Sequence, residues 1–234
     1  MKITFERNKD LSFKINEAYK TLRTNIRFAG DDIHVIAITS SVPNEGKSEV
    51  SFQLAKSLTE DGNKVLYMDA DIRKSVTVAR YGVDIETKGL SHYLSGQCEM
   101  DKIIYETNIE NFSIIFTGQI APNPAELLGN DRFHNMIASL RETYDYVIID
   151  CPPLGSVIDA AIVAKEADGA VIVIETENVS YKIVQRVKKQ LEQSGCRILG
   201  AVLNKVEMGG KGYGYYGHYY GNYYGSYGEY GHEK

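Results

Sequence analysis

The stretch that most constrains this chain is the segment of residues 41–48, Ser-Val-Pro-Asn-Glu-Gly-Lys-Ser, which directly follows a short apolar run. A glycine, four variable residues and then Gly-Lys-Ser or Gly-Lys-Thr form a phosphate-binding loop, or P-loop, between a strand and a helix. Here Ser41 replaces the leading glycine, while Gly46, Lys47 and Ser48 are retained. The sequence therefore predicts a nucleotide-binding loop that departs from the standard pattern at its first position.

The residues of this loop have separate expected roles. Backbone N–H groups and the start of a helix, expected from Lys47 to about Glu60, converge on phosphate oxygens. Lys47 would reach the β- and γ-phosphates, and Ser48 would give its hydroxyl to Mg2+. A Gly-Lys-Ser tripeptide alone also fits an ordinary connection between a strand and a helix. The apolar run before it and the amphipathic pattern after it favour nucleotide binding.

Composition limits the kinds of partner and compartment. The chain has 234 residues, 43% of them apolar, which suffices for one α/β domain with an appendage. Its formal net charge of -5 argues against a nucleic-acid partner, which needs a basic surface. The three cysteines lack metal-ligand spacing and fit a reducing cytosol. No segment approaches the ~20 apolar residues of a membrane span or the apolar core of a signal peptide, so we expect a cytoplasmic protein.

The N-terminal part predicts an amphipathic helix at about residues 12–29. Apolar residues recur there at helical spacing, at Ile15, Ala18, Tyr19, Leu22, Ile26 and Phe28. Glu17, Lys20, Arg23 and Arg27 lie three or four apart on another stripe. From periodicity alone this stripe is most simply a solvated face, and the alternative is a charged interface with a neighbouring subunit.

Strand and helix patterns alternate along the rest of the chain. We expect strands at residues 64–68, 112–116, 144–150, 170–174 and 198–203. We expect helices at residues 89–94, 98–105, 132–143, 157–166 and 180–194, and a loop into a helix at residues 117–128. This alternation predicts an α/β fold, a mostly parallel P-loop NTPase sheet flanked by helices with right-handed crossovers.

Acidic residues follow two of the expected strands. Asp150 ends a nearly continuous apolar strand, which is the Walker B pattern. In this role its carboxylate would hold the Mg2+ of a nucleotide. The alternative is that Asp150 caps the Pro-Pro turn that follows. Asp69 and Asp71 come at the end of the expected strand at residues 64–68 and, being two residues apart, would point the same way on a strand. One carboxylate can coordinate metal while the other accepts a proton from a nucleophile, which is water in an ATPase and a phenol in a tyrosine kinase.

The composition changes to glycine and tyrosine from Met208 onward. We expect residues 208–234 to be a flexible tail and residues 1–207 to form the P-loop domain, because the tail cannot bury a core. A sticky, solvated end is the simplest interpretation of such a tail. It nevertheless carries nine phenols on a tether, at Tyr213, Tyr215, Tyr216, Tyr219, Tyr220, Tyr223, Tyr224, Tyr227 and Tyr230.

Together these motifs resemble the bacterial tyrosine kinases (BY-kinases) of capsule and exopolysaccharide biosynthesis, in the form where the kinase is a separate cytoplasmic chain. The resemblance covers essentially the whole sequence. It rests on the P-loop, on Val-Leu-Tyr-Met-Asp-Ala-Asp-Ile-Arg-Lys at residues 65–74 (Walker A′), on Val-Ile-Ile-Asp at residues 147–150 followed by Pro-Pro, on Pro-Asn-Pro-Ala-Glu-Leu-Leu at residues 122–128, and on the tyrosine cluster.

The resemblance implies ATP-dependent autophosphorylation of the tail, in trans within an oligomer. The catalytic residues would be Asp69 as the base, Lys47 and Asp71. The Mg2+ ligands would be Ser48, Asp71 and Asp150. The nucleotide would contact the P-loop and the end of the last strand, at Ser41, Asn44, Glu45, Gly46, Lys47, Ser48 and Asn204.

The resemblance also implies partners. The family assembles into rings through Glu-x-x-Arg-x-x-Arg on the first helix, which here is Glu17, Lys20 and Arg23. A transmembrane polysaccharide co-polymerase would recruit the kinase to the inner face of the membrane and activate it, and a tyrosine phosphatase would reset it. Lys20 keeps the charge but lacks the planar fork of arginine. Ser75 stands where the family often has proline, and Cys151 where a small hydroxyl residue is common.

Two other functions fit parts of the pattern. A switch ATPase of the septum-site or plasmid-partition kind shares the fold, but carries a second lysine early in the P-loop, where this chain has Val42, and lacks a tyrosine tail. A nucleotide-sensing scaffold would use the tail only to bind partners. Formation of phosphotyrosine with Mg-ATP would separate the kinase from both.

Overall fold

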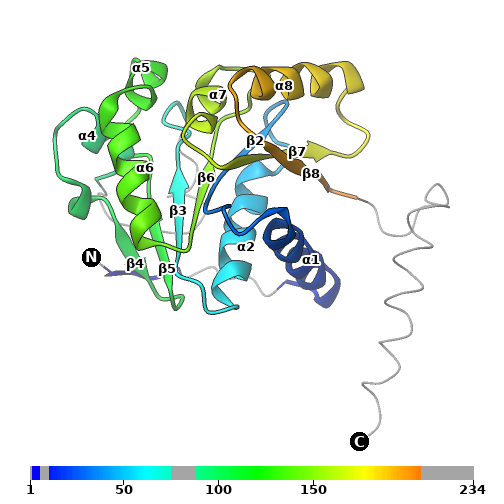
Figure 1. Cartoon of the computed structure of the whole chain (residues 1–234), viewed down its shortest axis with the longest axis horizontal. Helices are drawn as coiled ribbons and strands as arrows, with labels where there is room; N and C mark the ends of the chain where they lie inside the picture. The colour runs from blue at the N-terminus through cyan, green and yellow to red at the C-terminus, as the bar shows by residue number, and fades with distance from the viewer. Residues whose placement is uncertain (1, 6–10, 75–87, 207–234) are drawn as a thin grey trace, which may run out of the picture. The chain divides into compact units, whose positions relative to one another are not determined.

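A twisted sheet forms the centre of the protein (Figure 1). The computed structural model describes residues 2–5, 11–74 and 88–206. The strands are β1 (Lys2–Ile3), β2 (Val35–Ser40), β3 (Val65–Asp69), β4 (Tyr105–Thr107), β5 (Phe112–Ile115), β6 (Tyr146–Asp150), β7 (Gly169–Glu175) and β8 (Ile198–Asn204). Their order is β1-β4-β5-β3-β6-β2-β7-β8, and within the described residues β4 with β5 is the one antiparallel pair. The expected mostly parallel α/β sheet is confirmed.

Helices cover both faces of this sheet. They are α1 (Phe13–Ala29), α2 (Lys47–Thr59), α4 (Leu90–Leu94), the 3-10 turn η1 (Met100–Lys102), α5 (Pro124–Leu128), α6 (Asp131–Thr143), α7 (Asp159–Ala164) and α8 (Tyr181–Gln193). Helices α1 and α2 pack on one face, and α4 to α8 pack on the other. The result is three layers with the sheet in the middle, as α/β proteins require.

The central strands are apolar on both sides because both faces are covered. All six residues of β2 are buried. In β6, Ile148 packs in the core beneath α2, while Val147 and Ile149 pack beneath the helices of the opposite face. A parallel strand buried in this way appears in sequence as a continuous apolar run. This explains why the strands near the P-loop were the easiest elements to predict.

Several predicted elements have boundaries close to the observed ones, and a few predictions are wrong. Residues 98–105 were expected to be helical, but they hold only the short turn η1, and Tyr105 begins β4. Tyr105 and Thr107 are buried while Glu106 is exposed, the alternation of a strand that pairs with β5. Strand β1, near the start of the chain, was not predicted. It has only two residues, too few to show a periodic pattern, and it is fixed by pairing with β4.

The apolar stripe of α1 is also narrower than its sequence indicated. Ile26 is buried, but residues Phe28 and Ile15 are exposed, at 83% and 44% of their surface. Helix α1 packs mainly against α2, so one narrow edge of it suffices for packing.

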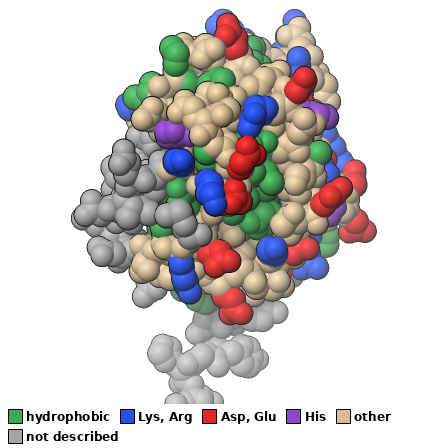
Figure 2. Space-filling model, turned by 90° about the vertical axis from the view of Figure 1, so that its left-hand side faces the viewer, with side chains coloured by type: hydrophobic (Ala, Val, Ile, Leu, Met, Phe, Trp, Pro, Cys, Tyr) green, Lys and Arg blue, Asp and Glu red, His purple; other side chains and the backbone are tan. Residues whose placement is uncertain are grey.

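Chain contacts divide the protein into two units, Met1–Asn204 and Lys205–Lys234. The nine tail tyrosines and Ser75 lie outside the described residues. On the face shown in Figure 2, acidic and basic side chains alternate instead of forming a field of one sign. Among the helices of the described ranges, none has the length and apolar character needed to cross a bilayer.

A charged cluster fixes the ends of β2 and β7 opposite the P-loop. The carboxylate of Asp168 accepts the backbone N–H groups of His34 and Val35 at 2.9 and 2.8 Å, and the guanidinium of Arg141 at 2.5 Å. Burial alone would raise the pKa of Asp168, but Arg141 and the two backbone donors outweigh it, so the pKa is lowered. The charged carboxylate is therefore the form that stabilises the fold.

We predict that Asp168→Asn lowers the free energy of unfolding at pH 7 by about 1–2 kcal/mol, since it removes charge-assisted hydrogen bonds. A lowered native pKa gives stability that is present above the unfolded value of about 3.9 and is lost as pH falls through the native value. The difference between variant and wild type should thus be constant from pH 7 to 5 and shrink below about pH 4. Urea unfolding at several pH values measures it. Asp101→Asn, at an exposed pair with Lys102, is the control and should change little; a pH-independent deficit at Asp168 would contradict the assignment.

Candidate active site

The P-loop connects β2 to α2 and is held in a left-handed turn. Asn44 and Gly46 have φ values of 70° and 89°, and α2 begins directly after Gly46. A Cβ atom on residue 46 would lie 2.1 Å from Nδ2 of Asn204. That amide donates to the carbonyl of Glu45 at 2.8 Å. Glycine is therefore required at position 46 both by its φ and by the approach of Asn204 from the end of β8.

Glu45 braces the loop from inside. Its buried carboxylate accepts the backbone N–H groups of Ser41 and Val42 at 2.6 and 2.7 Å, and that of Glu175 at 3.0 Å. These bonds join the two ends of the loop to each other and to the end of β7. The side chain of Glu45, which the sequence placed in the nucleotide site, is thus occupied in shaping the loop.

Ser41 shows why the leading glycine of the motif can be replaced. The left-handed residues of the loop are Asn44 and Gly46, and Ser41 is not among them. Its carbonyl oxygen instead lies close to Gly155, where an added Cβ would come within 2.1 Å. Gly155, in the segment after β6, permits this close approach to the loop. The buried hydroxyl of Ser41 has no hydrogen-bond partner among the described residues.

Lys47 lies between the acids that the sequence singled out. Its Nζ is 3.7 Å from Oδ2 of Asp71 and 3.5 Å from Oδ1 of Asp150. It also lies 3.3 Å from the hydroxyl of Ser48. Burial lowers the pKa of Lys47, but the charges of Asp150, Asp71 and Asp69 raise it by more, so the amine stays protonated.

Asp69 and Asp150 are neighbours because β3 and β6 are parallel and in register at these two residues. Asp150 is almost fully buried, and its carboxylate also lies 3.3 Å from the hydroxyl of Tyr67 and 3.4 Å from that of Ser51. Neither partner was predicted. Ser51 follows Lys47 by one helical turn, a spacing that could have identified it.

Asp71 is not part of the strand, although the prediction assumed that it was. Strand β3 ends at Asp69, so Asp71 lies in the turn that follows and does not share a strand face with Asp69. Instead, the N–H of Asp71 donates to Oδ1 of Asp69 at 3.1 Å. Burial raises the pKa of Asp71, and the charge of Asp150 adds to this, while Lys47 opposes it. Asp71 is the more exposed of the two acids, since its side chain is 16% exposed and the residue Asp69 only 2%.

Cys151 is not a nucleophile in this site. It follows Asp150 and is fully buried, and burial together with the charge of Asp150 raises the pKa of its thiol well above the usual value. A thiolate is the reactive form of cysteine. The chemistry available at this edge of the sheet therefore belongs to Lys47, Ser48 and the carboxylates.

The charged stripe on α1 lies elsewhere. Lys20 pairs with Glu17 at 2.7 Å on the surface of the helix. Arg23 contacts its own chain: its guanidinium donates to the carbonyl of Ser57 and lies 3.2 Å from Asp61, and its side chain is only 13% exposed. The structure thus separates Lys20, which is open to a neighbour, from Arg23, which holds the end of α2.

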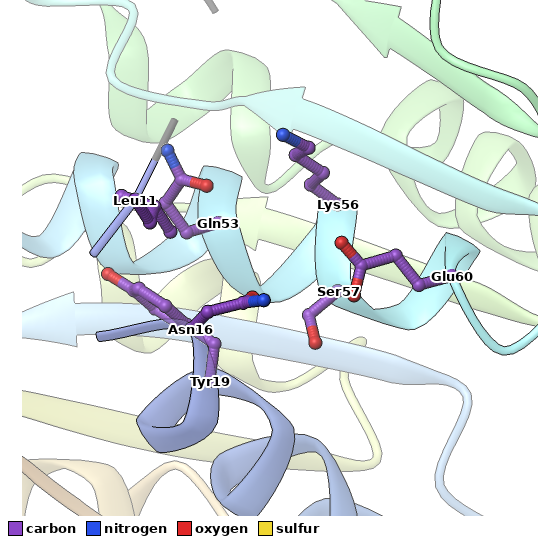
Figure 3. A pocket seen from close by; sticks show the side chains of 7 residues that line it. All are labelled: Leu11, Asn16, Tyr19, Gln53, Lys56, Ser57 and Glu60. Carbon is purple, nitrogen blue, oxygen red and sulfur yellow. The ribbon is translucent and has the colours of Figure 1, made fainter. Parts of the chain in front are cut away.

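A polar cavity of about 300 Å3 lies between α1 and the second half of α2 (Figure 3). It is lined by Leu11, Asn16, Tyr19, Gln53, Lys56, Ser57 and Glu60. None of these residues belongs to the P-loop or to the acidic cluster. Among the described residues, the acids around Lys47 lie at the carboxyl ends of β3 and β6, where open α/β sheets bind their ligands.

Known proteins are similar to this chain in sequence and in fold. A family model described as an AAA domain matches residues 33–198. The tyrosine-protein kinase CpsD of Streptococcus agalactiae is 43% identical over 205 residues, which cover 88% of this chain and 90% of that protein.

Solved structures agree. The kinase domain of the Escherichia coli tyrosine kinase ETK superposes with a TM-score of 0.75 at 34% identity, covering 86% of this chain and 80% of that one. The septum-site-determining protein MinD of Pyrococcus horikoshii, solved with Mg-ADP, superposes with a TM-score of 0.63 at 29% identity, covering 73% and 69%. A nucleotide-binding loop facing an acidic sheet edge, in a chain this similar to CpsD, shows that the protein belongs to the bacterial tyrosine-protein kinases.

Proposed function

We propose that this kinase uses ATP to phosphorylate the tyrosines of its own C-terminal tail, in trans within an oligomer. The observation that carries the proposal is the position of Lys47 between Asp71 and Asp150, on a chain that also supplies nine tail phenols. A transferring phosphoryl group needs positive charge and positioning more than covalent chemistry from the protein. Lys47 supplies that charge, and the tail supplies the acceptor.

The nucleotide would be held by the P-loop backbone, with Lys47 and Ser48 on its phosphates. Within the described residues, no group of three His, Cys, Asp or Glu forms a ready-made metal site. Mg2+ keeps several waters and is bound through one or two carboxylates together with the phosphates of the nucleotide. The hydroxyl of Ser48 and the carboxylates of Asp71 and Asp150 are the donors of the right kind. When bound, Mg2+ neutralises charge on the transferring phosphoryl group.

Asp69 is our candidate for the base that accepts the tyrosine proton. A phenol has a pKa of about 10, so a carboxylate within hydrogen-bond reach helps by taking the proton as the new bond forms. Asp69 is nearly buried, whereas Asp71 is more open and has a raised pKa. These two observations make Asp71 the second candidate for the same role.

The partners of the kinase follow from the same proposal. Subunits would meet through Glu17, Lys20 and Arg23 in a ring, residues 208–234 would act as a flexible tail, and a phosphatase would remove the phosphates. A transmembrane co-polymerase of capsule or exopolysaccharide synthesis would recruit the kinase to the inner face of the membrane and activate it. One relative is itself named a putative tyrosine-protein kinase in a cps region, in Klebsiella pneumoniae.

The first test is Lys47→Met, which keeps a stem of similar length and removes the charge. We expect phosphotyrosine formation with Mg-ATP to fall by about 10²–10³-fold, as when one preorganised charge-stabilising donor is lost. Anti-phosphotyrosine blots or intact mass measure it. Lys102→Met, at an exposed lysine, is the matched control and should remain active. Undiminished phosphotyrosine in the Lys47 variant would refute the proposed site.

The second test compares Asp69→Asn with Asp71→Asn. We expect Asp69→Asn to reduce the rate of transfer by about 10²–10⁴-fold with little change in ATP affinity, because a general base acts at the chemical step. Asp71→Asn should instead weaken binding of Mg-ATP. Single-turnover rates and nucleotide titrations measure the two effects. If Asp71→Asn loses only the rate and Asp69→Asn loses affinity, the two roles are exchanged.

The third test concerns assembly. Each phosphotyrosine adds about -1.5 to -2 charges at neutral pH, so several of them on one tail of an acidic protein repel one another and the acids of the site. We expect unphosphorylated protein to be oligomeric and heavily phosphorylated protein to be monomeric by light scattering. Lys20→Glu should weaken the oligomer without phosphate, and it is a cleaner probe than Arg23→Ala, which also removes contacts within the chain. Equal masses before and after extensive phosphorylation would contradict release of the tail.

A further inference from the structure

A bidentate ion pair lies beside the active site and has no place in the roles assigned so far. Nε and Nη2 of Arg73 donate to the two carboxylate oxygens of Asp159 at 2.7 and 2.9 Å. Asp159 is fully buried at the start of α7, while the side chain of Arg73 is 39% exposed. Two parallel hydrogen bonds of this kind fix geometry as well as charge.

The pair connects the two chain segments that carry the acids. Arg73 follows Asp71 by two residues, in the turn after β3. Asp159 follows Asp150 by nine residues, at the end of the segment that leaves β6. Strands β3 and β6 are neighbours in the sheet, and the acids near Lys47 lie at or just after their carboxyl ends. The ion pair therefore links the two segments that follow these strands.

The other contacts of the turn after β3 show what the ion pair adds. Before Asp71, the N–H of Ala70 donates to the carbonyl of Asp150 at 2.9 Å. After it, Ile72 is buried and its carbonyl accepts the N–H of Ala121 at 3.2 Å. Arg73 is the next residue, and through Asp159 it ties the turn to the same segment that begins at Asp150. The backbone of Asp71 is thus held on both sides, with the charged anchor on the C-terminal side.

A merely structural role is the competing interpretation, because a buried carboxylate must be paired whatever its location. The protein contains a natural comparison. Arg141 and Asp168 form another close Arg–Asp pair at the opposite edge of the sheet, near the start of β2. Breaking that pair perturbs the fold without touching the turn after β3.

We propose that Arg73 and Asp159 are positioning residues that hold Asp71 in place to receive the Mg2+ of the nucleotide. The inference rests on the proposed role of Asp71 as a metal ligand. Partners that orient a metal ligand typically change metal affinity or activity by about 10–100-fold when they are removed. The two residues should therefore act together, and through Mg2+.

The test measures ADP affinity by calorimetry, with Mg2+ and with EDTA, for the full chain and its variants. In Arg73→Lys, which keeps the charge but loses the fork, and in Asp159→Asn, the gain in ADP affinity on adding Mg2+ should fall by about tenfold. Affinity in EDTA should be unchanged. The double variant should lose no more than either single variant, since the residues act as one unit. The Mg2+ concentration that gives half-maximal tyrosine phosphorylation should rise in parallel.

Arg141→Lys is the matched control and should lower the melting temperature while leaving the Mg2+ effect unchanged. Arg73→Lys retains a cation for Asp159, so it keeps the test valid if Asp159→Asn fails to fold. Wild-type Mg2+ dependence in a folded Arg73→Lys would overturn this inference alone, and so would an equal loss in Arg141→Lys. Absence of any Mg2+ effect in the wild type would overturn the proposed metal role of Asp71 and the inference with it.

Discussion

The structure depends on a contact between one lysine and acids that belong to neighbouring strands. Asp69 and Asp150 are aligned by the parallel register of β3 with β6, and Asp71 lies in the turn that follows β3. Carboxylates this close repel one another in a buried environment. Lys47 lies within 3.7 Å of two of them, so the start of α2 and the sheet edge hold each other in place.

Much of the surrounding polar structure serves to keep that contact in one geometry. The carboxylate of Glu45 accepts the backbone N–H groups at the start of the P-loop, and Asn204, at the end of β8, donates to the backbone carbonyl of Glu45. Both are single side chains that hold backbone, which fixes the loop without help from a ligand. A phosphate cradle formed in advance loses less entropy when the nucleotide binds. Glu45 and Asn204 therefore shape the loop before any nucleotide is bound.

The sequence predicted what depends on local pattern and missed what depends on packing. The buried strands and the P-loop helix were located because an apolar run and a Gly-Lys-Ser turn can be recognised from sequence alone. Strands β1 and β4 were missed because they are short and are stabilised by each other. The acids were singled out by their place at strand ends, but the turn that holds Asp71 after β3 was not predicted. Tyr67 and Asp159 gave no signal because their importance comes from partners more than 80 residues away.

Helix α2 connects the proposed subunit contact to the chemistry. It runs from Lys47 to Thr59, 13 residues or about 20 Å. Arg23 of α1 lies at its far end, where a cation is favoured by the carbonyl of Ser57 and the helix dipole, and by Asp61. A neighbouring subunit that recruits Arg23 must compete with these contacts inside the chain. Recruitment of Arg23 by a neighbour would therefore cost the contacts that hold the C-terminal end of α2.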